Sequence, residues 1–426
     1  MPSARRPAPA RRGPRSALQR TFSSLSSRNY RLFFAGDLIS HAGSWMQSMA
    51  EAWLVLELTD SPVAVGATFA FRFLPVFCFG LWGGTVTDRF DRRRLLLVTQ
   101  TVSSILALGL GIVVRTGTVD VWMVYAFAAA LGMVTVVDEP SRNAFVEEMV
   151  GPEQMPNAVA LNGAVMNSAR ITGPAAAALL IPAVGLAAVF VVNALTFLAM
   201  IAALLAMRTA ELRPPHRQER PRVREGLRYA WSVPQIRLTM IIVGVVGTLV
   251  FNFPTFLTII ARETFAGGSS LAGLLMAVLG VGTVIGALRA AHAANPNRRS
   301  VLGSAALLGA SLVTASLMPN VVLFQVTLVP VGALAVFFGT TANAHMQMWS
   351  GTHIRGRVMA IFTLLTMGST VIGGPLVGWI CQEWTPRIGF GSAGLAALLT
   401  AALLAAPTGR TASFPIDTGP SPAVGD

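Results

Sequence analysis

The chain has 426 residues, of which 53% are hydrophobic and only 12% are charged. A soluble chain of this length carries about twice that share of charge. The composition therefore indicates a polytopic helical membrane protein and excludes an ordinary soluble domain. The two cysteines, Cys78 and Cys381, lie in apolar segments and are too few for a disulfide framework, so we expect them to be packing residues.

Twelve apolar windows are long enough to cross a membrane, which takes about 20 helical residues. They are 31–57, 62–87, 95–115, 119–138, 158–181, 186–207, 236–262, 269–290, 300–318, 321–342, 357–381 and 388–407. The longest internal break is polar and rich in Arg and Pro, and it divides the windows six plus six. We therefore expect five regions: a basic arm 1–30, a bundle 31–207, a linker 208–235, a second bundle 236–407 and a disordered tail 408–426.

The basic residues are all arginines, 32 in number, and they give a net charge of +13. They are spread over the arm and the loops rather than gathered in one domain, so nucleic-acid binding is not expected. Of those outside the middles of the windows, 27 fall on the side of the termini and three, Arg115, Arg262 and Arg387, on the other. By the positive-inside rule both termini are cytoplasmic.

The first window carries a polar stripe. Its members, spaced by four, three, four and three residues, are Asp37, His41, Ser44, Ser48 and Glu51. On a helix they share a face about 80° wide and about 21 Å long, which should turn to a water-filled cavity or to a protein partner. Asp37 and His41, one turn apart, are candidates for sharing a proton, and Glu51 is a third candidate for proton coupling. Ser44 and Ser48 either line a substrate cavity or bond back to their own helix.

Two arginines lie near the middles of windows, where a charge costs about 2.5–3.5 kcal/mol on insertion scales. Arg72 is in register to form an ion pair with Glu51 across two antiparallel helices. Arg170 has three candidate partners, and the sequence does not choose among them: Asp37, His41 and Asp138. We interpret Asp138 and Arg142 as a structural pair at the end of the fourth window.

The second half differs, because its windows contain no deeply placed charge. Phe251, Asn252 and Phe256 are its candidates for lining a substrate cavity, and Pro254 should kink the seventh window. The asymmetry suggests that the first half handles protons and that the second supplies an apolar, aromatic surface for the substrate. Weak repeats relate the halves, as in Gly173-Pro174 and Gly374-Pro375, and such repeats are typical of secondary transporters.

Segment 84–94 is an acidic and basic turn between two windows. It resembles the major facilitator signature Gly-x-x-x-Asp-Arg-x-Gly-Arg-Arg through Gly84, Asp88, Arg89 and Arg92, with Asp91 in place of a glycine. Segments 28–33, 53–62, 138–144 and 162–174 are similar to signatures of one branch, the transmembrane secretion effectors, which includes enterobactin exporters and macrolide efflux proteins. The resemblance implies an all-α fold of twelve transmembrane helices in two pseudo-symmetric six-helix bundles.

The resemblance also implies roles for single residues. Asp88 would cap or pair across the cytoplasmic interface of the two bundles, with Arg89 and Arg92 holding the turn, and so stabilise an outward-open state. Gly173 and Pro174 resemble the core of an antiporter motif in the fifth helix, which implies export. The alternative for the turn is a solvated topology signal alone.

We expect no cofactor, no metal site and no enzyme activity. A nucleotide-binding Gly-x-x-x-x-Gly-Lys-Ser/Thr segment is absent, and the five histidines are dispersed without metal-site spacing. The hypothesis is a monomeric, proton-coupled exporter in the lipid bilayer of a bacterial cytoplasmic membrane, moving an amphipathic small molecule such as a drug or a siderophore. The alternatives are an importer of the same fold and a non-transporting scaffold or sensor.

Overall fold

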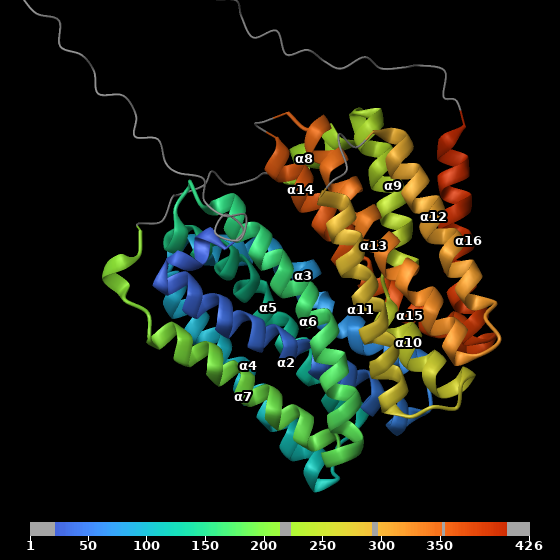
Figure 1. Cartoon of the computed structure of the whole chain (residues 1–426), viewed down its shortest axis with the longest axis horizontal. Helices are drawn as coiled ribbons and strands as arrows, with labels where there is room; N and C mark the ends of the chain where they lie inside the picture. Colours follow the sequence, from blue (N-terminus) through green and yellow to red (C-terminus); the bar gives the residue numbers. More distant parts are fainter. Residues whose placement is uncertain (1–21, 214–222, 292–296, 352–353, 407–426) are drawn as a thin grey trace, which may run out of the picture.

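The computed structural model describes residues 22–213, 223–291, 297–351 and 354–406, and every regular element in these residues is helical (Figure 1). Within them, eleven helical segments are long and apolar enough to cross a membrane. The polar-striped α2 (Arg28–Thr59) is not among the eleven, but at 32 residues it is long enough to span. The predicted architecture of two six-helix bundles is confirmed. Most of the arm, the middle of the linker and the tail lie outside the described residues.

The first bundle consists of continuous helices: α2, α3 (Pro62–Arg89), α4 (Arg92–Thr116), α5 (Val121–Val150), α6 (Met155–Val184) and α7 (Leu186–Leu205). Three of them stay continuous although they contain internal prolines, as at Pro75 in α3 and Pro140 in α5. Asp91 caps the start of α4, where its carboxylate accepts a hydrogen bond from the Arg94 amide at 2.8 Å. This cap gives the aspartate that departs from the family signature a structural role.

The second bundle contains interrupted helices. It consists of α9 (Pro234–Leu249), α10 (Phe253–Ile259) with the π-helical turn η3 (Ile260–Thr264), α11 (Ser269–Ala291), α12 (Arg298–Ser316), α13 (Val321–Trp349), α14 (Arg355–Thr363) with the π-helical turn η4 (Leu364–Gly368), α15 (Thr370–Glu383) and α16 (Pro386–Ala405). The predicted distortion at Pro254 is a full break between α9 and α10. Part of the linker forms α8 (Val223–Ser232), whose Tyr229 hydroxyl donates to the Trp349 carbonyl at 3.4 Å. The remaining short turns are η1 (Ser23–Ser26) and η2 (Thr209–Glu211).

The bundles meet through two equivalent contacts, α3 on α15 and α6 on α11. A β-carbon at Gly66 would overlap the Gly374 carbonyl, and one at Gly273 would overlap the Pro174 carbonyl. Each contact joins a glycine of one bundle to the Gly-Pro helix of the other, and both members shift by about 200 residues between the two contacts. The weak sequence repeat therefore corresponds to a repeated backbone contact between the bundles.

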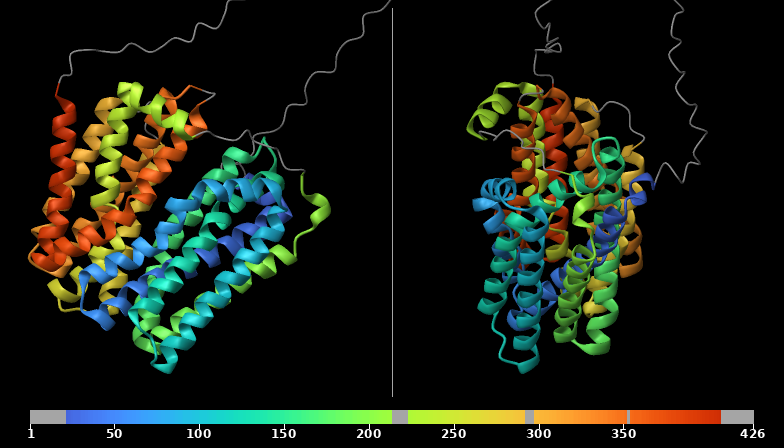
Figure 2. Two further views of the ribbon diagram at one scale, coloured as in Figure 1. Left: turned by 180° about the vertical axis from the view of Figure 1, so that it is seen from behind. Right: turned by 90° about the vertical axis from the view of Figure 1, so that its left-hand side faces the viewer.

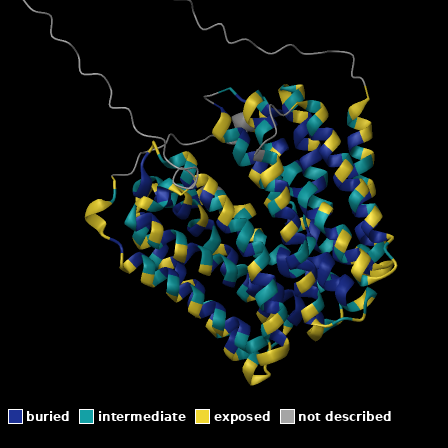
Figure 3. Cartoon of the chain, in the orientation of Figure 1, coloured by how far each residue is buried: buried dark blue, intermediate teal, exposed yellow. Residues whose placement is uncertain are grey.

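The bundles are joined at one end and diverge toward the other (Figures 1 and 2). We call the end at which α16 finishes the terminal face, and the opposite end the far face (Figure 1). At the far face Arg262 forms an ion pair with Asp60, and the Ser61 hydroxyl donates to Gln382 at 2.8 Å. Buried residues are concentrated where α10 and α15 approach the first bundle (Figure 3).

Candidate functional site

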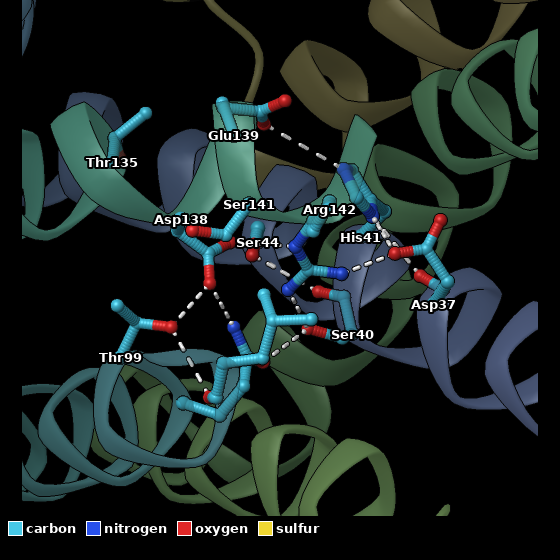
Figure 4. A network of polar contacts seen from close by, with 12 residues as sticks. Asp37, Ser40, His41, Ser44, Thr99, Thr135, Asp138, Glu139, Ser141 and Arg142 are labelled. Atoms are coloured by element: carbon cyan, nitrogen blue, oxygen red, sulfur yellow. Dashed lines mark hydrogen bonds and ion pairs between the residues drawn. The ribbon is translucent and has the colours of Figure 1, made fainter. Parts of the chain in front are cut away.

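A buried ion-pair network joins α2 to α5 in the first bundle (Figure 4). The guanidinium of Arg142 forms ion pairs with Asp37 and, from Nε at 2.6 Å, with Asp138. His41 lies beside this pair, with Nδ1 3.3 Å from an Asp37 carboxylate oxygen and Nε2 3.9 Å from Glu139. Asp37, Asp138 and Arg142 are all more than 90% buried, whereas the side chain of Glu139 is 48% exposed.

Neutral side chains complete the network from α4. The Asp138 carboxylate accepts hydrogen bonds from Thr99 at 2.5 Å and from Gln100 at 2.8 Å. Gln100 in turn accepts from the Ser40 hydroxyl at 3.1 Å, which returns the chain of contacts to α2. These contacts satisfy the carboxylate that Arg142 alone would leave partly unpaired, as a buried polar network requires.

The charges of the buried part do not balance without a proton. Counted with both carboxyl groups ionised and His41 neutral, Asp37 and Asp138 carry two negative charges against the single positive charge of Arg142, and the formal sum is −1. One proton on His41, or shared between it and Asp37, brings the sum to zero. The formal charge of this buried group therefore differs by one unit between its two protonation states, and uncompensated charge inside a membrane is costly. Through its Nε2 contact, His41 also connects this group to the half-exposed side chain of Glu139.

The other end of the stripe forms a separate group around Glu51. The predicted ion pair is present, with Arg72 Nη1 3.2 Å from the Glu51 carboxylate. Gln47 donates to the other carboxylate oxygen at 2.7 Å and accepts from Asn193 of α7 at 2.5 Å. Glu51 is 1% exposed and is fully engaged by these partners. Its geometry is that of a structural pair, about 21 Å along the helix from Asp37.

Arg170 is paired with none of its three predicted candidates, because Asp37 and Asp138 bind Arg142 and His41 lies between Asp37 and Glu139. Its guanidinium lies over the ring of Trp45, 5.5 Å from the centroid, and its buried Nε has no hydrogen-bond partner.

The Gly-Pro pair that follows Arg170 lies where three helices cross. Gly173 packs on the backbone of α2, where a β-carbon would overlap the Ala42 carbonyl, and Pro174 contacts Gly273 of α11. The antiporter-like motif is therefore at the junction of the two bundles.

The candidate cavity residues are mostly engaged within their own bundles. Ser44 and Ser48 donate back along α2 to the carbonyls of Ser40 and Ser44, each at 2.9 Å. Phe256 is fully buried against Phe390, with ring centroids 5.2 Å apart. Their lining of a substrate cavity stays a prediction.

Phe251 and Asn252 lie at the break between α9 and α10. Phe251 is partly buried and lies 6.4 Å from Phe338 between ring centroids. Asn252 is buried and donates to the Thr248 carbonyl at 2.7 Å, while its side-chain oxygen has no partner among the described residues. That oxygen is a free acceptor at the interruption of the seventh span.

The signature turn lies at the terminal face, where the bundles diverge. Asp88 and Arg89 are exposed, and a β-carbon at Gly84 would meet nothing within 4 Å. Arg92 is buried and forms an ion pair with Glu148 of α5 at 2.8 Å. In this conformation the turn is therefore anchored within the first bundle.

Several members of the network were not anticipated from the sequence. The sequence pairs Arg142 with Asp138 alone, yet Arg142 also binds Asp37, and no sequence motif points to Glu139, Thr99 or Gln100 as members. The signal available in the sequence is the run of polar residues in the third window, Thr99, Gln100, Thr101, Ser103 and Ser104. In the part of the chain that the structure describes, no group of three His, Cys, Asp or Glu side chains could hold a metal ion.

The family and its relatives agree with this architecture. The family model described as "Transmembrane secretion effector" matches residues 19–414. The staphyloferrin A transporter of Staphylococcus aureus is 21% identical, over 83% of this chain and 89% of that protein. The multidrug efflux pump Tap of Mycobacterium tuberculosis is 27% identical, over 82% and 85%.

The fold is also that of solved transporters. A crystal structure of a POT family transporter in complex with a thioalcohol conjugated peptide superposes with a TM-score of 0.72 at 10% identity, covering 90% of this chain and 98% of that one. With the family match over nearly the whole chain, the protein is a multi-pass membrane transporter rather than an enzyme, and it belongs to the transmembrane secretion effector family of major facilitator transporters.

Proposed function

We propose that this transporter is a proton-coupled exporter of an amphipathic small molecule and that its terminal face is cytoplasmic. The observation that carries the proposal is the charge imbalance of the buried network, in which Asp37 and Asp138 face the single cation Arg142. One proton on Asp37 or His41 restores neutrality. No cofactor is needed in this scheme, because the proton gradient supplies the energy.

The direction of transport is supported by the relatives and by the arginines. The relative Tap is named as a multidrug efflux pump, and the matching family is described as a transmembrane secretion effector, so both descriptions indicate export. The sequence has 27 arginines on the side of the termini and three on the other, which supports a cytoplasmic orientation of the terminal face. With the bundles joined at the far face, the conformation is then inward-open and ready to receive substrate from the cytoplasm.

In the proposed cycle, substrate enters while the network lacks its proton. Rocking of the bundles closes the terminal face and opens the far face, where a proton from the more acidic exterior restores charge balance and favours release and return. His41 moves the proton between Asp37 and the half-exposed Glu139. Arg142 holds both carboxylates in place and keeps its own charge throughout.

The test is accumulation of a panel of dyes and antibiotics in a host depleted of its own efflux pumps, with and without a protonophore. Wild type is compared with Asp37→Asn and with Glu57→Gln, a carboxylate on the same helix that bonds Trp53 outside the network. We expect lower accumulation for wild type and Glu57→Gln in energised cells only, and none of this lowering for Asp37→Asn.

Two results would contradict the proposal. Export that persists unchanged after addition of the protonophore would exclude proton coupling. Equal accumulation in wild-type and empty cells for every compound, with no change in secreted metabolites, would exclude export. Matched membrane abundance of the three proteins is the control for both.

A further inference from the structure

The feature that the proposed cycle leaves unexplained is Arg170. Three other buried or half-buried arginines of the first bundle have carboxylate partners: Arg72 with Glu51, Arg92 with Glu148, and Arg142 with Asp37 and Asp138. Arg170 has no ion-pair partner in the described residues, and its buried Nε has no hydrogen-bond acceptor. A cation at this depth without a counterion indicates a functional site.

The position of Arg170 limits what its partner can be. It lies 15 residues from the start of α6, so about 22 Å of helix separate it from either end. Lipid headgroups sit at the ends of such a helix and are out of reach. The backbone of Arg170 and Ile171 also packs against Gly280 of α11, at the junction of the two bundles. A solute bound between the bundles is therefore the partner within reach.

The surroundings of the guanidinium fit a carboxylate beside an aromatic group. The Arg170 guanidinium carbon lies over the Trp45 ring, 5.5 Å from its centroid, and this cation–π contact uses none of the N–H donors of the guanidinium. A guanidinium edge matches the two oxygens of a carboxylate in a bidentate contact. Trp45 is itself only partly buried, so its ring also offers apolar surface to the same solute.

We propose that Arg170 binds the anionic group of the transported solute, so that the substrate class is a small molecule with a carboxylate next to an apolar or aromatic body. This inference rests on the proposed transport function and deepens it. Trp45 is the positioning residue for the guanidinium. A permanently cationic solute is disfavoured at the site, because it would add a second uncompensated positive charge next to Arg170.

The test measures binding of three fluorescent probes that share one aromatic body: pyrenebutyrate, pyrenebutanamide and pyrenebutylamine. Purified full-length protein in detergent, without lipid and without a proton gradient, is titrated and followed by fluorescence anisotropy. We expect the acid to bind roughly tenfold or more tightly than the amide, and the amine to bind weakest. Arg170→Gln should abolish the preference for the acid and leave the affinity for the amide within about twofold, and Arg170→Lys should restore part of the preference.

Arg115→Gln, the same change at an exposed arginine near the end of α4, is the matched control and should behave as wild type. Equal binding of the three probes by wild type, no saturable binding of the acid, or an undiminished preference in Arg170→Gln would each overturn the inference. The comparison within wild type decides the matter even if the variant does not fold. Because no gradient is present, failure here leaves proton coupling standing, and failure of energised export leaves the binding result standing.

Discussion

The two bundles share one fold but differ in their buried charges and in the regularity of their helices. The first bundle keeps its helices continuous through internal prolines and buries four ion pairs, those of Arg142 with Asp37 and Asp138, Arg72 with Glu51, and Arg92 with Glu148. The second has no deeply placed charge in its spans and interrupts two of them, once between α9 and α10 and once at the π-helical turn η4.

The buried charges are thus in one bundle and the irregular, more easily deformed helices are in the other. Buried ion pairs demand fixed geometry, because a small displacement leaves a charge without its partner. Interrupted helices leave backbone groups that exchange partners at low cost and are common at functional sites in transporters. We therefore expect the first bundle to move as a rigid body that holds the buried charges. The changes of shape that accompany transport should be concentrated at the helix breaks of the second bundle.

The largest effect is expected when the cation of the buried network is removed. Arg142→Leu leaves two buried carboxylates, Asp37 and Asp138, without the guanidinium that compensates their charge, and we expect a loss of about 3–5 kcal/mol in the free energy of unfolding. The measurement is equilibrium unfolding in mixed micelles. Adding Asp37→Asn and Asp138→Asn to Arg142→Leu should recover most of the loss, since no charge is then stranded. A loss below about 1 kcal/mol for Arg142→Leu alone would show that the network is hydrated and not a rigid unit.

A second test places the same substitution at two glycines of α3. Gly66→Leu forces a side chain into the Gly374 carbonyl, so we expect destabilisation by about 1–3 kcal/mol and separation of the bundles at the far face. Spin labels at the ends of α3 and α15 measure the separation. Gly84→Leu is the control, because nothing lies within 4 Å of a β-carbon there, and it should change stability by less than about 0.5 kcal/mol. Equal effects at both glycines would contradict this description of the interface.

The uncharged polar contacts of the second bundle should matter less than the ion pairs of the first. Thr239→Val removes the hydroxyl that lies 2.8 Å from the buried ring nitrogen of His345, and we expect a loss of about 1 kcal/mol. Thr248→Val is matched to it, because that hydroxyl bonds only the Gly244 carbonyl of its own helix, and it should be nearly neutral. Unfolding of both variants under the conditions used for Arg142→Leu places them on one scale, and a loss as large as that of Arg142→Leu would remove the distinction between the bundles.

The smallest effect on stability is expected for the ion pair that joins the two bundles at the far face. Asp60 and Arg262 form an ion pair across the far face, but the Asp60 side chain is 77% exposed. A double-mutant cycle with Asp60→Asn and Arg262→Gln should give a coupling of about 0.2–1 kcal/mol that shrinks at high salt. Asparagine is suitable because Asp60 has a left-handed backbone, with φ 47°, which asparagine tolerates. Coupling that persists in 1 M salt would mean that the pair is shielded from water.

Much of the fold followed from sequence patterns that have a local cause. Apolar length predicted the spans, Pro254 predicted the break in the seventh, and the spacing of Glu51 and Arg72 predicted their ion pair. These outcomes depend on neighbours in the chain or on one antiparallel helix pair, and such relations are visible in a single sequence.

The composition of the site was less predictable. The polar stripe on α2 is one face in the sequence, but in the structure its two ends meet different helices. Asp37 binds α5, whereas Glu51 binds Arg72 of α3 and reaches α7 only through Gln47. Which carboxylate Arg142 or Arg170 reaches depends on how each helix is rotated about its axis, and tertiary packing sets that rotation. For this reason Asp37, a candidate partner of Arg170 in the sequence, is bound by Arg142 in the structure.

The contact between Gly66 and Gly374 has a mechanical consequence. It lies near one end of α3, whereas the exposed Arg89 ends the same helix 23 residues further on, about 35 Å away. A rotation of about 10° around the glycine contact would displace that end by about 6 Å while the glycines hardly move. The close backbone contact of Gly66 and Gly374 would thus act as the fulcrum of a lever. The signature turn, at the other end of α3, would move furthest when the bundles rotate.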